Sequence, residues 1–242
     1  MKFRDLTLIK VGIGQTMVIA CDSLGAIGAK KADQLQTSGE IVGRLTVRVP
    51  LMEVVAAGAQ PLAVVNTLCV EMEPTGRAII AGIQQELAAA GFADLPITGS
   101  TEENMLTVQT GVGVTVIGLV ATSALRLGEA TKGSTVFCVG KPKVGEEVLA
   151  GESVADVPLV RALLMLADVQ EVLPVGSKGI LYEANQLAKS ANLTFIANEV
   201  NDLELTKSAG PGTCVLVAAS AGCANEVCKI CRLPVVSIGE LV

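Results

Sequence analysis

The longest uncharged stretch of the chain, residues 104–125, carries apolar residues at every second position over much of its length. The apolar members are Leu106, Val108, Val112, Val114 and Val116, and Thr, Gln and Gly stand between them. The stretch is long enough to span a bilayer, but a period of two with β-branched residues is typical of a strand in a soluble sheet. We therefore predict a strand or hairpin over 107–120 rather than a membrane helix.

The remainder of the first half alternates between strand-like and helix-like patterns. Apolar runs predict strands over 16–23, 60–72 and 95–100, and the first ends at Asp22. Helical spacing covers 37–59, with a capping-box pattern from Thr37 to Glu40 and a kink or new helix expected at Pro50. A second helix is predicted over 75–92. The order β, α, β, α, β, β predicts an α+β fold with helices on one face of a mixed sheet.

The pattern pauses over 121–133, where we place a boundary between a domain at 1–122 and a domain at 123–242. Strands are then predicted over 134–142, 213–220 and 232–242, and helices over 156–169 and 180–193. These elements predict a smaller α/β domain that follows the first.

Composition removes several classes of function. Of 242 residues, 50% are hydrophobic and 17% are charged, which is the balance of a folded globular protein. A net charge of -6, a single Tyr and no Trp argue against nucleic acid as a partner, because that binding needs clustered cations and stacking rings. The absence of His excludes Ser-His-Asp and Cys-His catalysis and His-ligated metals. Carboxylates with a hard cation such as Mg²⁺ remain, and they usually serve phosphate chemistry.

The N-terminal segment MKFRDLTLIK is charged throughout, unlike a signal peptide, so we expect a cytoplasmic protein without a membrane partner. The seven cysteines of the chain are then expected to be free thiols rather than disulfides. Cys223, Cys228 and Cys231 have a C-x4-C-x2-C spacing that suggests zinc or an iron–sulfur cluster. A fourth ligand would have to come from Cys214 or elsewhere, so an Ala-containing helix with Cys as a small apolar residue is favoured.

Acidic residues stand at the ends or edges of the predicted elements of the first half. Asp22 follows the first strand, Glu53 lies on the first helix, and Glu102 and Glu103 follow the turn PITGS, with Asn104 beside them. Converging carboxylates at strand ends suit a magnesium ion that is shared with substrate phosphates. Taken singly, each residue is more typical of a solvated turn or helix face.

Basic residues near these carboxylates are candidates for phosphate contacts. Lys30 follows a Gly-containing loop, and Arg44 and Arg48 are four residues apart on one predicted helix face. Such a pair is either a phosphate clamp or a charged surface. No Gly-x-x-x-x-Gly-Lys-Ser/Thr motif is present, which excludes a P-loop enzyme. The further candidate nucleotide contacts are Gly25, Gly99, Ser100, Thr101, Glu103, Asn104 and Gly111.

Four segments resemble, in the same order, the N-terminal half of the aminoimidazole ribonucleotide synthetase superfamily. They are ACDSLGAIG, VPLMEVVAAGAQPLAVVNTL, PITGSTEENM and GVGVTVIG. The superfamily also contains thiamine-monophosphate kinase, selenophosphate synthetase and a hydrogenase-maturation dehydratase. The resemblance implies a two-domain ATP-dependent enzyme, usually a homodimer in which the N-terminal sheets pair and ATP binds close to that interface.

The resemblance also implies a metal site in this chain. It implies Asp22 and Glu53 as Mg²⁺ ligands, together with a third acid after the Gly-Ser turn. Because Thr101 stands where relatives carry that acid, the third ligand becomes Glu102 or Glu103, and Glu102 is preferred.

Differences from the motifs of the relatives help to choose among the activities of the superfamily. VGIGQTM lacks the Cys and Lys of selenophosphate synthetases, GELV lacks the terminal Cys of the dehydratase, and GSKGIL places Lys178 in the Ser-Asp-Gly motif of thiamine-monophosphate kinase. NTLCVEMEPTGR and TGSTEEN are most similar to α-ribazole kinases. That similarity implies transfer of the ATP γ-phosphoryl group to the 5′-hydroxyl of α-ribazole, in cobalamin lower-ligand salvage. The alternatives are a thiamine-monophosphate kinase-like or ring-closing activity, and a nucleotide-binding regulator without chemistry.

Overall fold

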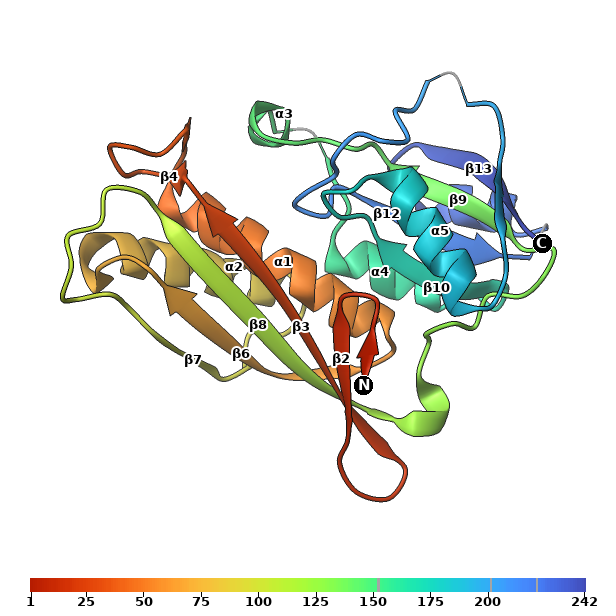
Figure 1. Ribbon diagram of the computed structural model, residues 1–242, viewed down its shortest axis with the longest axis horizontal. Helices are drawn as coiled ribbons and strands as arrows, with labels where there is room; N and C mark the ends of the chain where they lie inside the picture. Colours follow the sequence, from red (N-terminus) through yellow and green to blue (C-terminus); the bar gives the residue numbers. More distant parts are fainter. Residues whose placement is uncertain (152, 201, 221) are drawn as a thin grey trace. The chain divides into compact units, whose positions relative to one another are not determined.

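The computed structural model describes residues 1–151, 153–200, 202–220 and 222–242, which fold as two units (Figure 1). Unit 1 consists of Met1–Val54 and Ala59–Ser123, and unit 2 of Val55–Gly58 and Ala124–Val242. Within these ranges, none of the helices combines the length and the apolar character that crossing a membrane requires. The uncharged stretch after Asn104 forms a loop and then a sheet strand, as its period of two predicted.

Unit 1 contains a six-stranded sheet with the order β1-β2-β3-β8-β6-β7. The strands are β1 (Lys2–Phe3), β2 (Leu6–Lys10), β3 (Gln15–Gly25), β6 (Gln60–Leu68), β7 (Ile97–Ser100) and β8 (Gly111–Ala121). Neighbouring strands pair antiparallel except β6 and β7, which are parallel. The sheet is therefore mixed, as predicted. A small parallel pair, β4 (Ile27–Gly28) with β5 (Leu35–Gln36), lies outside it.

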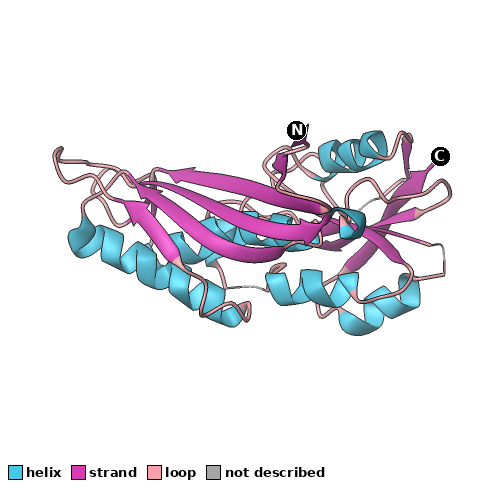
Figure 2. Cartoon of the chain, turned by 90° about the horizontal axis from the view of Figure 1, so that it is seen from below, coloured by secondary structure: helices cyan, strands magenta, loops and turns pink. Residues whose placement is uncertain are grey.

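The alternation along β3 and β8 gives the sheet two different faces. On β8, Val112, Val114 and Val116 are buried, while the residues between them are half-buried. The buried face lies against α1 (Gly39–Ala56) and α2 (Arg77–Ala89), which cover the same side of the sheet (Figures 1 and 2). Successive side chains of a strand point to opposite faces, so the pattern sorts the valines into the core.

Glycines allow α1 and α2 to pack unusually closely. A Cβ atom on Gly43 would overlap the carbonyl oxygen of Ile79, and one on Gly82 would overlap that of Glu40. α1 continues through Pro50 without interruption. Its first turn is capped by Ser38, whose Oγ accepts a hydrogen bond from the Ile41 N–H at 3.4 Å. This corrects the predicted capping box, which began one residue earlier.

Unit 2 contains a five-stranded sheet with the order β10-β12-β9-β13-β11. The strands are β9 (Thr135–Gly140), β10 (Val169–Pro174), β11 (Phe195–Ala197), β12 (Cys214–Ala219) and β13 (Val235–Leu241). The short helix η2 (Thr122–Ala124) spans the boundary at which the chain enters the unit, and the helices of the unit are α3 (Glu146–Leu149), α4 (Val157–Leu164), α5 (Ile180–Ser190) and α6 (Ala224–Ile230). Neighbouring strands of this sheet pair antiparallel over the described residues, and the unit is not smaller than unit 1. Both findings correct the predicted smaller α/β domain.

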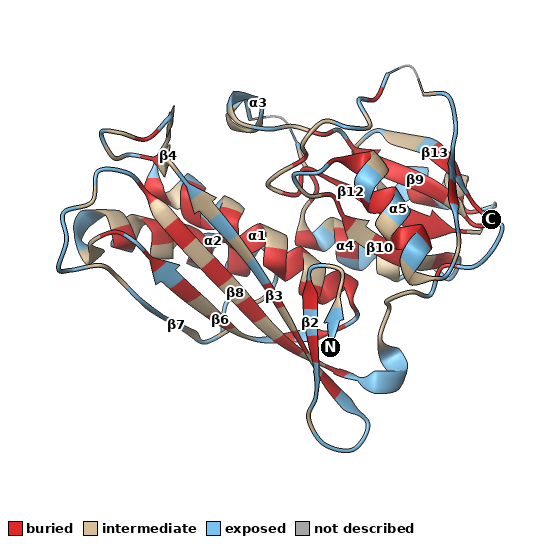
Figure 3. Cartoon of the chain, in the orientation of Figure 1, coloured by how far each residue is buried: buried red, intermediate tan, exposed pale blue. Residues whose placement is uncertain are grey.

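Both faces of the unit 2 sheet are covered. Every residue of β12 is buried, which requires side chains packed on each side (Figure 3). On one side, Cys138, Cys214 and Leu216 pack with Ile180 and Leu187 of α5 in a single apolar cluster. The helix predicted over 156–169 ends at Leu164, and β10 takes up the apolar residues that follow.

Candidate functional site

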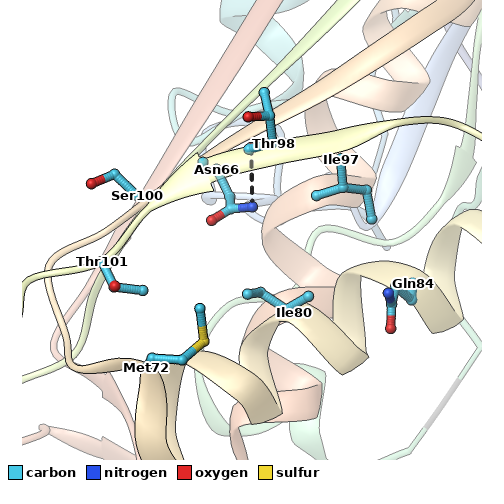
Figure 4. Close-up of a pocket in the computed structure, with 9 residues that line it drawn as sticks. Asn66, Met72, Ile80, Gln84, Ile97, Thr98, Ser100 and Thr101 are labelled. Carbon is cyan, nitrogen blue, oxygen red and sulfur yellow. Dashed lines mark hydrogen bonds between the residues drawn. The ribbon is translucent and has the colours of Figure 1, made fainter.

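A pocket of about 250 Å³ opens between the edge strand β7 and helix α2 of unit 1 (Figure 4). It is lined by Asn66, Met72, Ile80, Gln84, Ile97, Thr98, Gly99, Ser100 and Thr101. Three of the predicted nucleotide contacts, Gly99, Ser100 and Thr101, therefore lie together in one concave site. The structure adds two carboxamides, Asn66 and Gln84, that the sequence reading missed.

The wall of the pocket depends on a close fit between two strands. Asn66 of β6 stands opposite Gly99 of β7, and its Nδ2 donates a hydrogen bond to the carbonyl oxygen of Thr98 at 3.2 Å. A Cβ on Gly99 would overlap the backbone and side-chain oxygens of Asn66. Only glycine at position 99 leaves room for the Asn66 carboxamide, which is itself 3% exposed.

The loop that follows β7 is held in place by its own carboxylates. Oε1 of Glu102 accepts hydrogen bonds from the backbone N–H groups of Asn104 and Met105, at 2.7 and 3.1 Å. Those bonds lower the pKa of the Glu102 carboxyl. Oε1 of Glu103 accepts from the Met72 N–H at 2.9 Å and from Thr101 at 2.7 Å. Both acids thus stabilise the mouth of the pocket, and Asn104 is exposed beside them.

Lys30 reaches the same region from the loop around β4. Its Nζ lies 2.6 Å from Oε2 of Glu71 and 3.1 Å from the carbonyl oxygen of Thr107. Glu71 also accepts a hydrogen bond from Thr75 in the short helical turn η1 (Met72–Gly76). The Lys30 side chain is 12% exposed, so it ties the β4 loop to the pocket loop. The predicted phosphate contact of Lys30 stays a prediction.

Asp33, which the sequence reading did not single out, anchors the base of this region. The buried carboxylate accepts hydrogen bonds from the Thr110 N–H and hydroxyl, each at 2.7 Å, and from the Lys30 N–H at 2.9 Å. Two of the predicted glycine contacts lie nearby in register, because Gly25 of β3 stands opposite Gly111 of β8. Asp33 therefore fixes the β4 loop against the start of β8.

Asp22 lies inside β3, three residues before its end, rather than after the strand as predicted. It stands opposite Val114, and Val114 stands opposite Asn66 on the next strand. Burial raises the pKa of the Asp22 carboxyl, and a backbone hydrogen bond at Ser23 opposes that effect. A half-buried carboxylate with a raised pKa is one that a nearby cation would stabilise in its charged form.

The predicted carboxylates occupy three different elements of unit 1. Asp22 is on β3, Glu53 is half-buried in α1, and Glu102 is in the loop after β7. Over the described ranges, no three or more His, Cys, Asp or Glu side chains are grouped closely enough to hold a metal ion. The structure thus does not bring the three acids together, and it does not group Cys223, Cys228 and Cys231 either.

Arg44 and Arg48 both turn toward Glu86 on α2. Arg48 is buried, and its Nε and Nη2 lie 2.6 and 3.0 Å from the two oxygens of Glu86. The Nε of the more exposed Arg44 lies 3.4 Å from Oε2 of the same carboxylate. The geometry favours an ion pair between helices over the predicted phosphate clamp.

Comparisons with known proteins agree with this architecture. Residues 4–120 match the family model described as AIR synthase related protein, N-terminal domain. A comparison with curated protein sequences gave no match.

Three solved structures are similar along nearly the whole chain. The HypE–HypF complex is 16% identical with a TM-score of 0.70, and the match covers 98% of this chain and 86% of that chain. Phosphoribosylformylglycinamidine synthase II of Thermotoga maritima is 18% identical with a TM-score of 0.71, and the match covers 98% of this chain and 42% of that chain. Thiamine-monophosphate kinase of Stenotrophomonas maltophilia is 16% identical with a TM-score of 0.64, and the match covers 99% of this chain and 89% of that chain. At these identities the likeness shows the fold alone. Residues 4–120 are thus similar to the AIR synthase related family, and the chain as a whole shares the fold of these solved structures.

Proposed function

We propose that the protein is a magnesium-dependent, ATP-using phosphotransferase with its nucleotide site in unit 1. One geometric relationship carries the proposal: Asp22, Val114, Asn66 and Gly99 are successive register partners across four strands. Asp22 and Asn66 are thus two strands apart, about 10 Å between their backbones, and both belong to the face of the sheet that the helices cover. At that separation, Asp22 suits the metal-bound phosphates of a nucleotide, and the uncharged pocket beside Asn66 suits its base.

The residues present fit a magnesium ion chemically. Asp22, Glu53 and Glu102 are oxygen donors, and Mg²⁺ keeps several waters and takes only one or two carboxylates, so a closed cluster of acids is not required. When bound with ATP, the cation neutralises charge on the transferred phosphoryl group. The protein's part is to position ATP and the acceptor, with the Gly99–Thr101 turn beside the nucleotide and Lys30 as a cation that contacts the pocket loop at Thr107.

Relatives with this fold support an adenine nucleotide as the cofactor. Their solved structures include Thermotoga maritima PurL complexed with ATP and AaThiL complexed with AMPPCP and TMP. For the acceptor we propose the 5′-hydroxyl of α-ribazole, on the resemblance of the segments around Met72 and Glu102 to α-ribazole kinases. Activities like those of thiamine-monophosphate kinase or of the ring-closing synthetases are the alternatives within the same superfamily.

We further propose a homodimer in which the uncovered faces of two unit 1 sheets pair, in the cytoplasm. Several residues on that face are apolar and not fully buried in one chain: Ile19 and Ile117 are half-buried neighbours, and Ile9 and Leu62 are each 44% exposed. Contiguous exposed apolar surface of this kind is typical of an interface.

Incubation of the protein with magnesium-ATP and a panel of acceptors tests the reaction directly. The panel contains α-ribazole, thiamine monophosphate and aminoimidazole precursors, and mass spectrometry reads the products. We expect α-ribazole 5′-phosphate and ADP in equal amounts. ADP and inorganic phosphate without a phosphorylated product would instead support a ring-closing type of chemistry. ATP binding with no turnover on any acceptor would support the regulator and overturn the kinase.

A further inference from the structure

The pocket beside β7 is uncharged, which limits what it can hold. Its polar groups are two carboxamides and three hydroxyls, and its other side chains are Met72, Ile80 and Ile97. A triphosphate would lose its water there without gaining a cation. The volume of about 250 Å³ also lies just below the range typical of whole ligand sites, about 300–1,000 Å³. The pocket therefore suits one flat, neutral ring system.

The hydrogen bond that Asn66 makes fixes how its carboxamide is oriented. Nδ2 donates to the Thr98 carbonyl oxygen at 3.2 Å, and Oδ1, at the other end of the amide, lies over Gly99, which also lines the pocket (Figure 4). In Figure 4 that oxygen lies on the side of the carboxamide nearer Thr101, and the nitrogen on the side nearer Ile97. Asn66 thus presents an acceptor to the pocket and keeps its donor for the strand.

Gly99 prevents the carboxamide from being displaced. The side-chain oxygen of Asn66 occupies the volume that a Cβ at position 99 would take, so the amide lies flat against the glycine. Asn66 is also 3% exposed, which means that its acceptor is largely removed from bulk water. A buried acceptor of fixed orientation discriminates strongly, because a ligand without a matching donor leaves it unpaired.

We propose that Asn66 Oδ1 accepts a hydrogen bond from the exocyclic amino group of a 6-aminopurine, so that this pocket selects adenine nucleotides. The inference rests on the proposed function and names the specificity-determining residue of its nucleotide site. A 6-oxo purine places a lone pair where the amino group would donate, and it is rejected. Gln84, on the opposite wall and exposed, can donate or accept and adapts to the remaining ring edge.

The Asn66 acceptor also distinguishes the binding site of the nucleotide from that of the acceptor nucleoside. A benzimidazole riboside has no N–H on its ring system, so it offers nothing that Asn66 Oδ1 can accept. The pocket is therefore assigned to the base of the triphosphate, and the acceptor nucleoside must bind elsewhere.

Equilibrium binding of three triphosphates tests the assignment. Calorimetry with magnesium present compares ATP, ITP and purine riboside triphosphate, which carries hydrogen in place of the amino group. We expect wild-type protein to bind ATP about 10- to 100-fold more tightly than either analogue. Asn66→Leu should bind all three with equal, weak affinity. Thr67→Val, the next residue on β6 with an exposed side chain, should keep the wild-type preference.

The outcomes distinguish failure of the role assigned to Asn66 from failure of the proposed function. If wild-type protein binds the three triphosphates equally, or if Asn66→Leu keeps the preference for ATP, the role of Asn66 is overturned and the proposed function stands. If wild-type protein binds none of them, the proposed function is overturned and this inference with it. Should Asn66→Leu fail to fold, Gly99→Ala provides the second variant: it displaces the carboxamide without removing it, and it should erase the preference for ATP.

Discussion

The guanidinium of Arg48 and the carboxylate of Glu86 form a two-pronged ion pair between α1 and α2, with N–O distances of 2.6 and 3.0 Å. Both side chains are less than a tenth exposed. Two charges removed from water in this way depend on each other, because either one alone would be left without compensation. The close approach of the helices at Gly43 brings the two residues within reach.

Removal of one partner of this pair should destabilise the protein strongly. We expect Glu86→Gln or Arg48→Met to lower the free energy of unfolding by about 3–5 kcal/mol, measured by urea denaturation. Arg44→Ala, which removes the exposed partner of the same carboxylate, should cost about 1 kcal/mol or less. If Arg48→Met instead keeps wild-type stability and loses affinity for ATP, the phosphate clamp predicted from the sequence is the correct role.

The contact between Gly43 and Ile79 should tolerate no side chain. Because a Cβ at position 43 would overlap the Ile79 carbonyl oxygen, Gly43→Ala must push the helices apart. We expect a loss of about 1–3 kcal/mol in the free energy of unfolding. Gly25→Ala is the control, since a Cβ there meets nothing within 4 Å. Its stability should match wild type, and a fall in ATP affinity in that variant would support the predicted nucleotide contact of Gly25.

Asp22 should be needed for activity and not for stability. Burial raises the pKa of its carboxyl, so the ionised form is less favourable in the folded protein than in the unfolded chain. The resulting cost to folding is absent below the unfolded pKa and grows as the pH rises toward the folded pKa and above it. Asp22→Asn should therefore unfold at the same or a higher urea concentration at pH 7.

The same variant should lose phosphoryl transfer by about 100-fold or more, because a metal-bound phosphate contributes several kcal/mol to the transition state. Asp94→Asn, at an exposed position in the α2–β7 loop, is the matched control and should keep full activity. Wild-type turnover by Asp22→Asn at matched magnesium would remove Asp22 from the metal site.

Glu71 should contribute stability that disappears in acid. Burial alone would raise its pKa, but hydrogen bonds from Lys30 and Thr75 outweigh that effect and leave the pKa below its ordinary value. A carboxyl with a lowered folded pKa stabilises the protein above the unfolded pKa of about 4.3 and loses that contribution as the pH falls through the folded pKa.

Comparison of wild type with Glu71→Gln across pH tests this pair. At pH 7 we expect wild-type protein to be more stable by about 1 kcal/mol, since the Glu71 side chain is 31% exposed. The difference should shrink as the pH falls from about 5 toward 3. A difference that stays constant over that interval would show that the charge of Glu71 is not its source.

Period and spacing were sufficient to predict four of the six strands of the unit 1 sheet and its helices α1 and α2, whereas β1 and β2 were not predicted. The strict alternation in β8 and the helical spacing around Val47 and Leu87 each have one interpretation that buries the apolar residues. In unit 2, the stretch from Leu163 to Val175, which is apolar except at Asp168, Gln170 and Glu171, contains the end of a helix and a complete strand. A short apolar run does not distinguish these two structures, so the boundary there was missed.

The candidate site was predicted less completely than the fold because its contacts join residues distant in sequence. The pairing of Arg48 with Glu86 follows from helix packing, which an i, i+4 spacing on one helix does not reveal. Asn66 did leave a signal: it is the one carboxamide in the stretch PLAVVNTL, which is apolar apart from Asn66 and Thr67. A polar residue in a buried strand is more informative than an apolar one, and that signal was available in the sequence.

The proposed dimer makes a final prediction at Ile117 on the uncovered face of the unit 1 sheet. Ile117 stands opposite Ile19, and both are half-buried in a single chain. A carboxylate at position 117 would be desolvated without a partner if two such faces meet, so Ile117→Glu should convert a dimer to a monomer in size-exclusion chromatography with light scattering. Ala88→Glu adds the same charge at an exposed position of α2 and should leave the dimer intact. A wild-type protein that is monomeric at all concentrations would overturn the pairing, as would an Ile117→Glu variant that remains dimeric.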